Sequence, residues 1–213
     1  MKTVILTVLA VLLFCAMGSA APTYLGPSGL ANVPLPTAMG SGQYNLFYNM
    51  ISGDADVSIF GGNVGLGMKT PIEIGATVVN PEGGTSETII NAKVALQVGE
   101  VEPIDLAVGV IDLSDEFDQT VYLSAGKMLT RTSRGGVPPV YGVLGFGNSD
   151  GGTLDGVFLG VTTRLPAGIE AHVEYDTEDL NLGLNYTVSD VLNLRADAVS
   201  GDIGFGVSYK FAR

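Results

Sequence analysis

Apolar and polar residues alternate with a period of two along most of the chain after residue 42. The last such segment is the clearest, since Ile203, Phe205, Val207, Tyr209 and Phe211 alternate with glycine, serine and lysine. Successive side chains of a β-strand point to opposite faces, so this period predicts strands with one apolar and one polar face. The same alternation recurs at 72–78, 90–98, 104–110, 169–175, 180–187 and 192–198.

Weaker strand patterns fill the remaining stretches, where glycine and aromatic residues blur the two faces. They lie at 43–51, 56–67, 118–128, 139–147 and 154–164. Short connections rich in turn residues separate neighbouring segments, which is typical of strands joined in simple up-and-down order. We therefore predict one closed antiparallel up-and-down β-barrel over residues 43–213, with about twelve strands and about ten or fourteen as alternatives.

The composition of the two faces predicts a transmembrane barrel. The polar face holds mostly Gly, Asn, Ser and Thr, and charged residues make up 15% of the chain, against about 25% in soluble domains. A soluble barrel would instead cover its outer face with charge. We expect a protein of the bacterial outer membrane with lipid and the barrel-assembly machinery as partners; a secreted soluble β-barrel is the alternative.

The first twenty residues have the pattern of a signal peptide. Lys2 is followed by the apolar run 4–17 and by the small residues Gly18, Ser19 and Ala20, which predicts cleavage after Ala20 and export. The only cysteine, Cys15, lies in this segment. We therefore expect no disulfide and no cysteine ligand in the exported part.

Residues 21–42 form a third region that has no period and is rich in proline and glycine. Its larger apolar side chains need a partner away from water. These are Tyr24, Leu25, Leu30, Val33 and Leu35. Two arrangements stay open from the sequence: an irregular lead-in across the rim of the barrel, or a plug inside it.

Charged residues on the polar faces are the candidate functional residues, because those faces would line the lumen. They are Glu73, Lys93, Asp105, Arg164, Glu170, His172, Glu174, Arg195, Asp197 and Lys210. Unpaired charge is costly in a confined interior, so we expect pairing across strands. The set is interpreted either as the lining of a selective constriction or as a salt-bridged, largely closed lumen.

The sequence predicts neither an enzyme nor a cofactor or metal site. His172 is the only histidine, so a Ser-His pair acting on lipid would require it, yet its strand position faces the lumen. Glu170, His172 and Glu174 share one strand face and could hold a cation, but the pattern favours a histidine hydrogen-bonded to carboxylates. With 22 Asp and Glu against 10 Lys and Arg, nucleic acid is excluded as a partner.

Alternate turns differ in charge. One set contains Asp54, Glu82, Glu87, Asp115, Glu116, Asp150, Glu178, Asp179 and Asp202. The other set contains Lys69, Arg131 and Arg134. In an up-and-down barrel each set gathers at one end, so one rim is predicted to be acidic and to meet cations, although no spacing defines a cation site.

The start of the irregular region and the strands after it resemble YjbH-like outer-membrane barrels. The matching residues are Leu25-Gly26-Pro27-Ser28-Gly29-Leu30, Val33-Pro34, Pro36-Thr37-Ala38, Gly65-Leu66-Gly67 and Ile72-Glu73-Ile74-Gly75. The resemblance covers roughly residues 25–79 and implies a barrel linked to exopolysaccharide secretion. We expect a narrow channel or an export component for small solutes or polysaccharide; a structural or binding barrel with a closed lumen is the alternative.

Overall fold

The computed structural model describes residues 21–53, 56–99, 103–116, 119–131, 138–149, 152 and 154–212. Within these ranges the strands are β1 (Gln43–Ser52), β2 (Val57–Leu66), β3 (Ile72–Pro81), β4 (Glu87–Val98), β5 (Ile104–Ile111), β6 (Thr120–Thr130), β7 (Val140–Asn148), β8 (Gly156–Arg164), β9 (Ile169–Tyr175), β10 (Leu180–Thr187), β11 (Leu192–Val199) and β12 (Asp202–Ala212). A single 3-10 turn, η1 (Pro166–Gly168), joins β8 to β9 in this described part. The predicted signal peptide, residues 1–20, lies outside the described residues, as do Asp54, Asp150 and Arg134.

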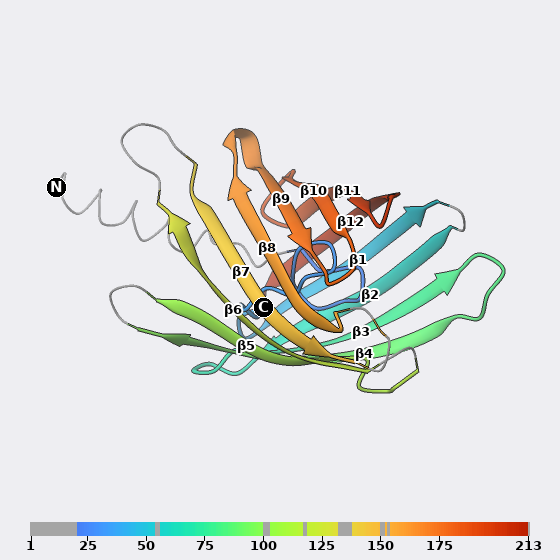
Figure 1. Cartoon of the computed structure of the whole chain (residues 1–213), viewed down its shortest axis with the longest axis horizontal. Coiled ribbons are helices and arrows are strands. Elements are labelled where there is room, and N and C mark those ends of the chain that lie inside the picture. The colour runs from blue at the N-terminus through green and yellow to red at the C-terminus, as the bar shows by residue number, and fades with distance from the viewer. Residues whose placement is uncertain are drawn as a thin grey trace.

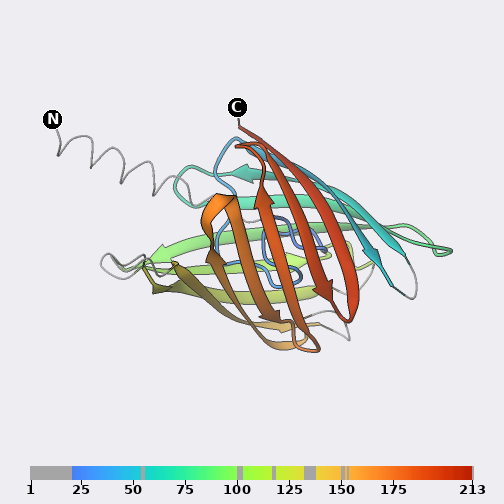
Figure 2. The ribbon, with the colours of Figure 1, turned by 90° about the horizontal axis from the view of Figure 1, so that it is seen from above.

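Hydrogen bonds close the sheet on itself. Each strand pairs antiparallel with its neighbour in the chain, and β1 pairs with β12 from Gln43↔Ala212 to Ser52↔Ile203. Figure 1 shows the ring of strands from the side and Figure 2 from above. The predicted closed up-and-down barrel of about twelve strands is therefore confirmed.

The two faces of the wall differ in exposure as the alternation requires. In β10 and β11, Leu182, Leu184 and Ala196 point outward and stay exposed, whereas Asn181, Asn185 and Arg195 between them are buried. The same contrast holds for most of the wall, including Leu123 at 53% exposed and Leu144 at 58%. The barrel therefore carries an apolar outer surface. In the described ranges, no helix is long and apolar enough to cross a membrane.

Residues 21–42, which we call the inner segment, lie inside the barrel rather than across its rim. Figure 2 shows this segment, in blue, enclosed between the red and orange strands and the green strands. It has no strand or helix, only the isolated bridges Pro22↔Ser28 and Gly29↔Pro34. Tyr24, Leu30 and Val33 are 2%, 0% and 0% exposed, so the apolar side chains of this region find their partners in the lumen.

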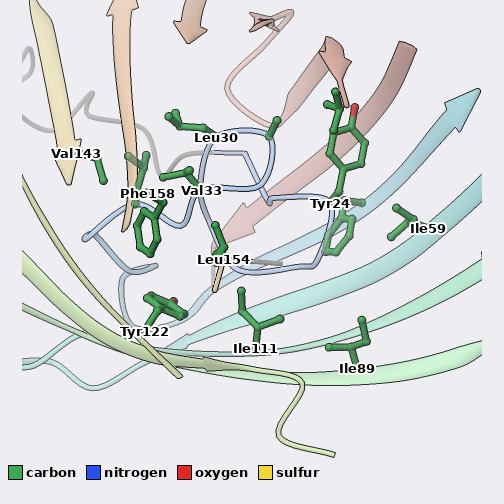
Figure 3. Packing of buried hydrophobic residues seen from close by; sticks show 14 of the residues in the cluster. Tyr24, Leu30, Val33, Ile59, Ile89, Ile111, Tyr122, Val143, Leu154 and Phe158 are labelled. Atoms are coloured by element: carbon green, nitrogen blue, oxygen red, sulfur yellow. The ribbon is translucent and has the colours of Figure 1, made fainter. Parts of the chain in front are cut away.

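An apolar core joins the inner segment to the wall, with side chains from β1 to β8 and from β11. Leu30 and Val33 belong to the same buried cluster as Tyr122 and Phe158, whose rings meet edge to face at 6.5 Å. Figure 3 shows these side chains converging from the segment and the strands. Glycine on the wall makes room for the segment, because a Cβ at Gly160 would lie 2.5 Å from a Leu30 methyl carbon.

Candidate functional site

The charged lumen candidates occupy inward-facing strand positions, at different depths. Six of them are buried: Glu73, Lys93, His172, Glu174, Arg195 and Asp197. Asp105, Glu170 and Lys210 are partly exposed, and Arg164 is exposed at the end of β8. The structure brings the buried ones together around the inner segment and leaves the others at one end of the barrel.

The first anchor is formed by Glu73 on β3 and Lys93 on β4, which lie opposite each other in the sheet. The Glu73 carboxylate accepts hydrogen bonds from the Ser28 backbone N–H and hydroxyl, both at 2.7 Å, and from Met39 N at 3.0 Å. The Lys93 ammonium donates to the carbonyl oxygens of Ser28 at 2.9 Å and Leu35 at 3.4 Å. The two side chains also pair directly, with Nζ 3.7 Å from Oε1. Both charges thus hold the main chain of the inner segment.

The second anchor is built around Glu174, near the end of β9. Its carboxylate accepts the backbone N–H groups of Asn32 at 2.7 Å and Val33 at 3.1 Å. Asn181 lies opposite Glu174 on the neighbouring strand β10 and donates hydrogen bonds to both Glu174 and Asp176. The Asn32 side chain donates to Asp176 at 2.7 Å. The carboxylates of Glu174 and Asp176 therefore hold a single turn of the inner segment, and the Asn181 amide donates to both carboxylates.

The third anchor lies on β11. Arg195 pairs with Asp197, with Nε 2.9 Å from Oδ2, and donates to the carbonyl oxygens of Pro22 and Leu30. Its guanidinium also lies 5.3 Å from the centre of the Tyr24 ring, close enough for a cation–π contact.

Tyr24 completes this anchor from the inner segment. Its hydroxyl donates to Asp197 Oδ2 at 2.8 Å. Burial, with Asp197 nearby, raises the pKa of the Tyr24 phenol well above its usual value, so the hydroxyl keeps the proton that it donates. The residue opposite is Gly204, where a Cβ would lie 1.9 Å from the Tyr24 oxygen. Only a glycine leaves room for this ring.

The remaining candidates have partners within the wall. Arg164 and Glu170 lie opposite each other on β8 and β9 and pair at 3.8 Å. Asp105 accepts hydrogen bonds from Tyr141 at 2.7 Å and Gln97 at 2.9 Å. Lys210 lies on the inward face of β12 at the same end of the barrel. These groups do not contribute to the three anchors.

The one histidine is engaged with a carboxylate. His172 Nε2 lies 3.2 Å from Asp197 Oδ1 in the buried third anchor. Glu170 pairs instead with Arg164, and Glu174 with the inner segment, so these three side chains of one strand face different partners. In the part of the chain that the structure describes, no group of three or more His, Cys, Asp or Glu residues could hold a metal ion.

The partners of the buried charges were not apparent in the sequence. Ser28, Asn32 and Tyr24 come from a region without a period, so no pattern predicts which of their main-chain and side-chain groups meet the wall. Asp176 belongs to a turn, where the alternation of strand residues does not predict which way a side chain points. Asn181 is the exception, because its position on the polar face of the strand after Glu174 places it beside that residue in an up-and-down barrel.

Comparison with known proteins supports the fold. No protein-family model matches the chain, and a comparison with curated proteins also finds no match. The chain is similar to the solved structure of the KdgM porin, with a TM-score of 0.54 and 12% identity over 79% of this chain and 99% of that one. The KdgM porin in complex with disordered oligogalacturonate gives a TM-score of 0.52 and 13% identity over the same shares. At such identity the likeness concerns the barrel fold alone.

Proposed function

We propose that this protein is a porin-like barrel of the bacterial outer membrane whose own inner segment closes the lumen at rest. The observation that carries the proposal is the pairing of a closed barrel, apolar on its outer face, with a buried segment held by lumen charges. Exposed side chains such as Leu144, Leu123 and Phe205, at 58%, 53% and 52%, suit lipid and would be costly in water. Insertion by the barrel-assembly machinery remains a prediction.

The anchors support a transport role over a catalytic one. The carboxylates and cations of the wall hold main-chain groups of a segment that leads directly into β1. Release of that segment would leave a lumen lined by charged and amide side chains, which is the lining of a selective pore. A narrow channel that opens when the segment moves follows from this arrangement.

The class of solute is proposed from two similarities to other proteins rather than from contacts in this structure. The KdgM porin has been solved with disordered oligogalacturonate, and the YjbH-like resemblance implies exopolysaccharide secretion. Both make an oligosaccharide the first class of solute to test, beginning with uncharged chains because the buried carboxylates of Glu174 and Asp176 disfavour an anionic one. Membership of the YjbH-like family and a role in export remain predictions.

The test begins with fractionation of the cell envelope and gel mobility before and after boiling. We expect the protein in the outer-membrane fraction, with a band that shifts on heating. In planar bilayers the full chain should conduct only in brief openings, and a variant lacking residues 23–40 that retains the heat shift should conduct continuously. A soluble protein without a heat shift, or a folded deletion variant without conductance, would refute the proposal.

A permanently closed barrel with a structural or binding role is the second candidate. The apolar core between the inner segment and the wall favours it, because Leu30, Val33 and Phe158 are each 0% exposed, and separating them is costly. Arg195→Ala distinguishes the two candidates, since it removes two hydrogen bonds to the inner segment. A movable segment predicts more frequent openings in this full-length variant, and a permanent one predicts none.

A further inference from the structure

Most charged side chains of the lumen are neutralised by an ion pair within the wall, and one is neutralised by other groups. Glu73 pairs with Lys93, Asp197 with Arg195, and Glu170 with Arg164. Every member of these pairs belongs to a strand of the wall. These pairs therefore persist wherever the inner segment lies.

Glu174 is compensated differently. It is 0% exposed, and among the residues that the structure describes it makes no ion pair with lysine or arginine. Two of its three hydrogen-bond donors, Asn32 N and Val33 N, belong to the inner segment. The third is the amide of Asn181, at 3.1 Å. Its charge is thus balanced mainly by the positive ends of two peptide dipoles that a moving segment would carry away.

The neighbouring groups do not replace those donors. His172, two residues earlier on β9, is turned to Asp197, and Asn181 is shared with Asp176. Asp176 is itself a carboxylate, 4% exposed, so it adds to the negative potential. The described residues of the turns at this end of the barrel include no lysine or arginine; they are 52–53, 56, 82–86, 112–116, 119, 149, 152, 154–155, 176–179 and 200–201.

We propose that Glu174 both holds the inner segment in the closed barrel and sets the charge selectivity of the open one. The inference rests on the proposed channel function. When the Asn32–Val33 turn leaves, Glu174 loses two of its three donors and becomes an uncompensated charge of the lumen, beside Asp176. A carboxylate in a confined, poorly hydrated passage attracts cations and repels anions. The open barrel therefore prefers small cations over anions, and Glu174 is the specificity-determining residue.

The test uses the full chain, opened by Leu30→Ala, in planar bilayers with a KCl gradient. The reversal potential gives the permeability ratio of potassium to chloride. We expect potassium selectivity in Leu30→Ala and a ratio that falls toward one when Glu174→Gln is added. The matched control is Glu178→Gln, which removes the same charge from an exposed position in the adjoining turn and should leave the ratio unchanged.

Each outcome decides one of the two proposals. An unchanged ratio in Leu30→Ala/Glu174→Gln overturns the role of Glu174 while leaving the channel intact. An equal fall with Glu178→Gln assigns selectivity to the acidic rim and also overturns it. Absence of openings in every variant that retains the heat shift overturns the channel function itself. Within the Glu174 proposal, Glu174→Gln alone should also raise the frequency of openings, because two charge-assisted hydrogen bonds are weakened.

Discussion

The inner segment meets two sides of the lumen that hold it in different ways. Toward β5–β8 the contacts are apolar, with Tyr122, Val143 and Phe158 in one cluster with Leu30. Toward β3–β4 and toward β9–β11 they include the buried charges, with Glu73, Glu174 and Arg195 bonded to its turns. Apolar burial gives most of the stabilisation but little direction, whereas the hydrogen bonds of buried charges fix where each turn lies. The comparison separates what keeps the segment in the lumen from what sets its register.

The largest effect is expected from breaking a buried pair on the polar side. Lys93→Ala leaves the Glu73 carboxylate with its hydrogen-bond donors but without its cation, which should cost about 3–5 kcal/mol. Urea unfolding in detergent micelles measures the loss. The double variant Glu73→Gln/Lys93→Ala should recover part of it; a double variant less stable than either single one would contradict the account of this anchor.

A similar or smaller loss is expected on the apolar side. Phe158→Ala opens a cavity against Tyr122 and the inner segment and should cost about 3–5 kcal/mol, with Leu30→Ala at about 2–5 kcal/mol. Protease digestion should show the inner segment more accessible in both variants. Leu182→Ala, on the outer face of β10, is the control and should leave that accessibility unchanged.

A steric change on the polar side should displace one anchor without removing a charge. A Cβ at Gly204 would lie 1.9 Å from the Tyr24 oxygen and 2.6 Å from its ring. Gly204→Ala should therefore move the ring away from Asp197 and increase channel openings. Combining it with Tyr24→Ala should relieve the clash. If Gly204→Ala is indistinguishable from the wild type in bilayers, the third anchor does not hold the segment.

The smallest effect is expected from a single neutral donor. Tyr24→Phe removes the hydrogen bond to the Asp197 carboxylate and should cost about 1.5–3 kcal/mol. Because the pKa of the Tyr24 phenol is raised on folding, its contribution is complete below pH of about 10 and is lost at higher pH. Stability measured against pH should therefore fall above about pH 10 in the wild type and less in Tyr24→Phe. Parallel curves for the two proteins would refute this assignment.

Sequence patterns predicted the wall far better than its contents. The segments 180–187 and 192–198 match β10 and β11 to within a residue, because alternation is a local property of a two-faced strand. The strand predicted at 118–128 is observed at Thr120–Thr130, where the pairing register shifts between Met128 and Thr130. A bulge of this kind interrupts the period on which the prediction depends.

The contents of the lumen depend on contacts that no local pattern records. Tyr24 and Asp197 are 173 residues apart in the chain, and they meet only because the sheet closes. Alternation could place Glu174 on the polar face, yet its main partners are backbone N–H groups, which every residue except proline carries. The identity of the residues around 32 therefore gave no indication of the contact.

The pairing of β12 with β1 has a consequence for the order of assembly. β1 and β12 are the first and last strands of the barrel, so their pairing closes a loop that spans the whole wall. Closing so long a loop is entropically slow. The inner segment contacts both edges of that seam, because Tyr24 lies against Gly204 of β12 and shares one apolar cluster with Phe47 of β1. We expect a chain without it to complete its barrel more slowly, even where the finished wall is the same.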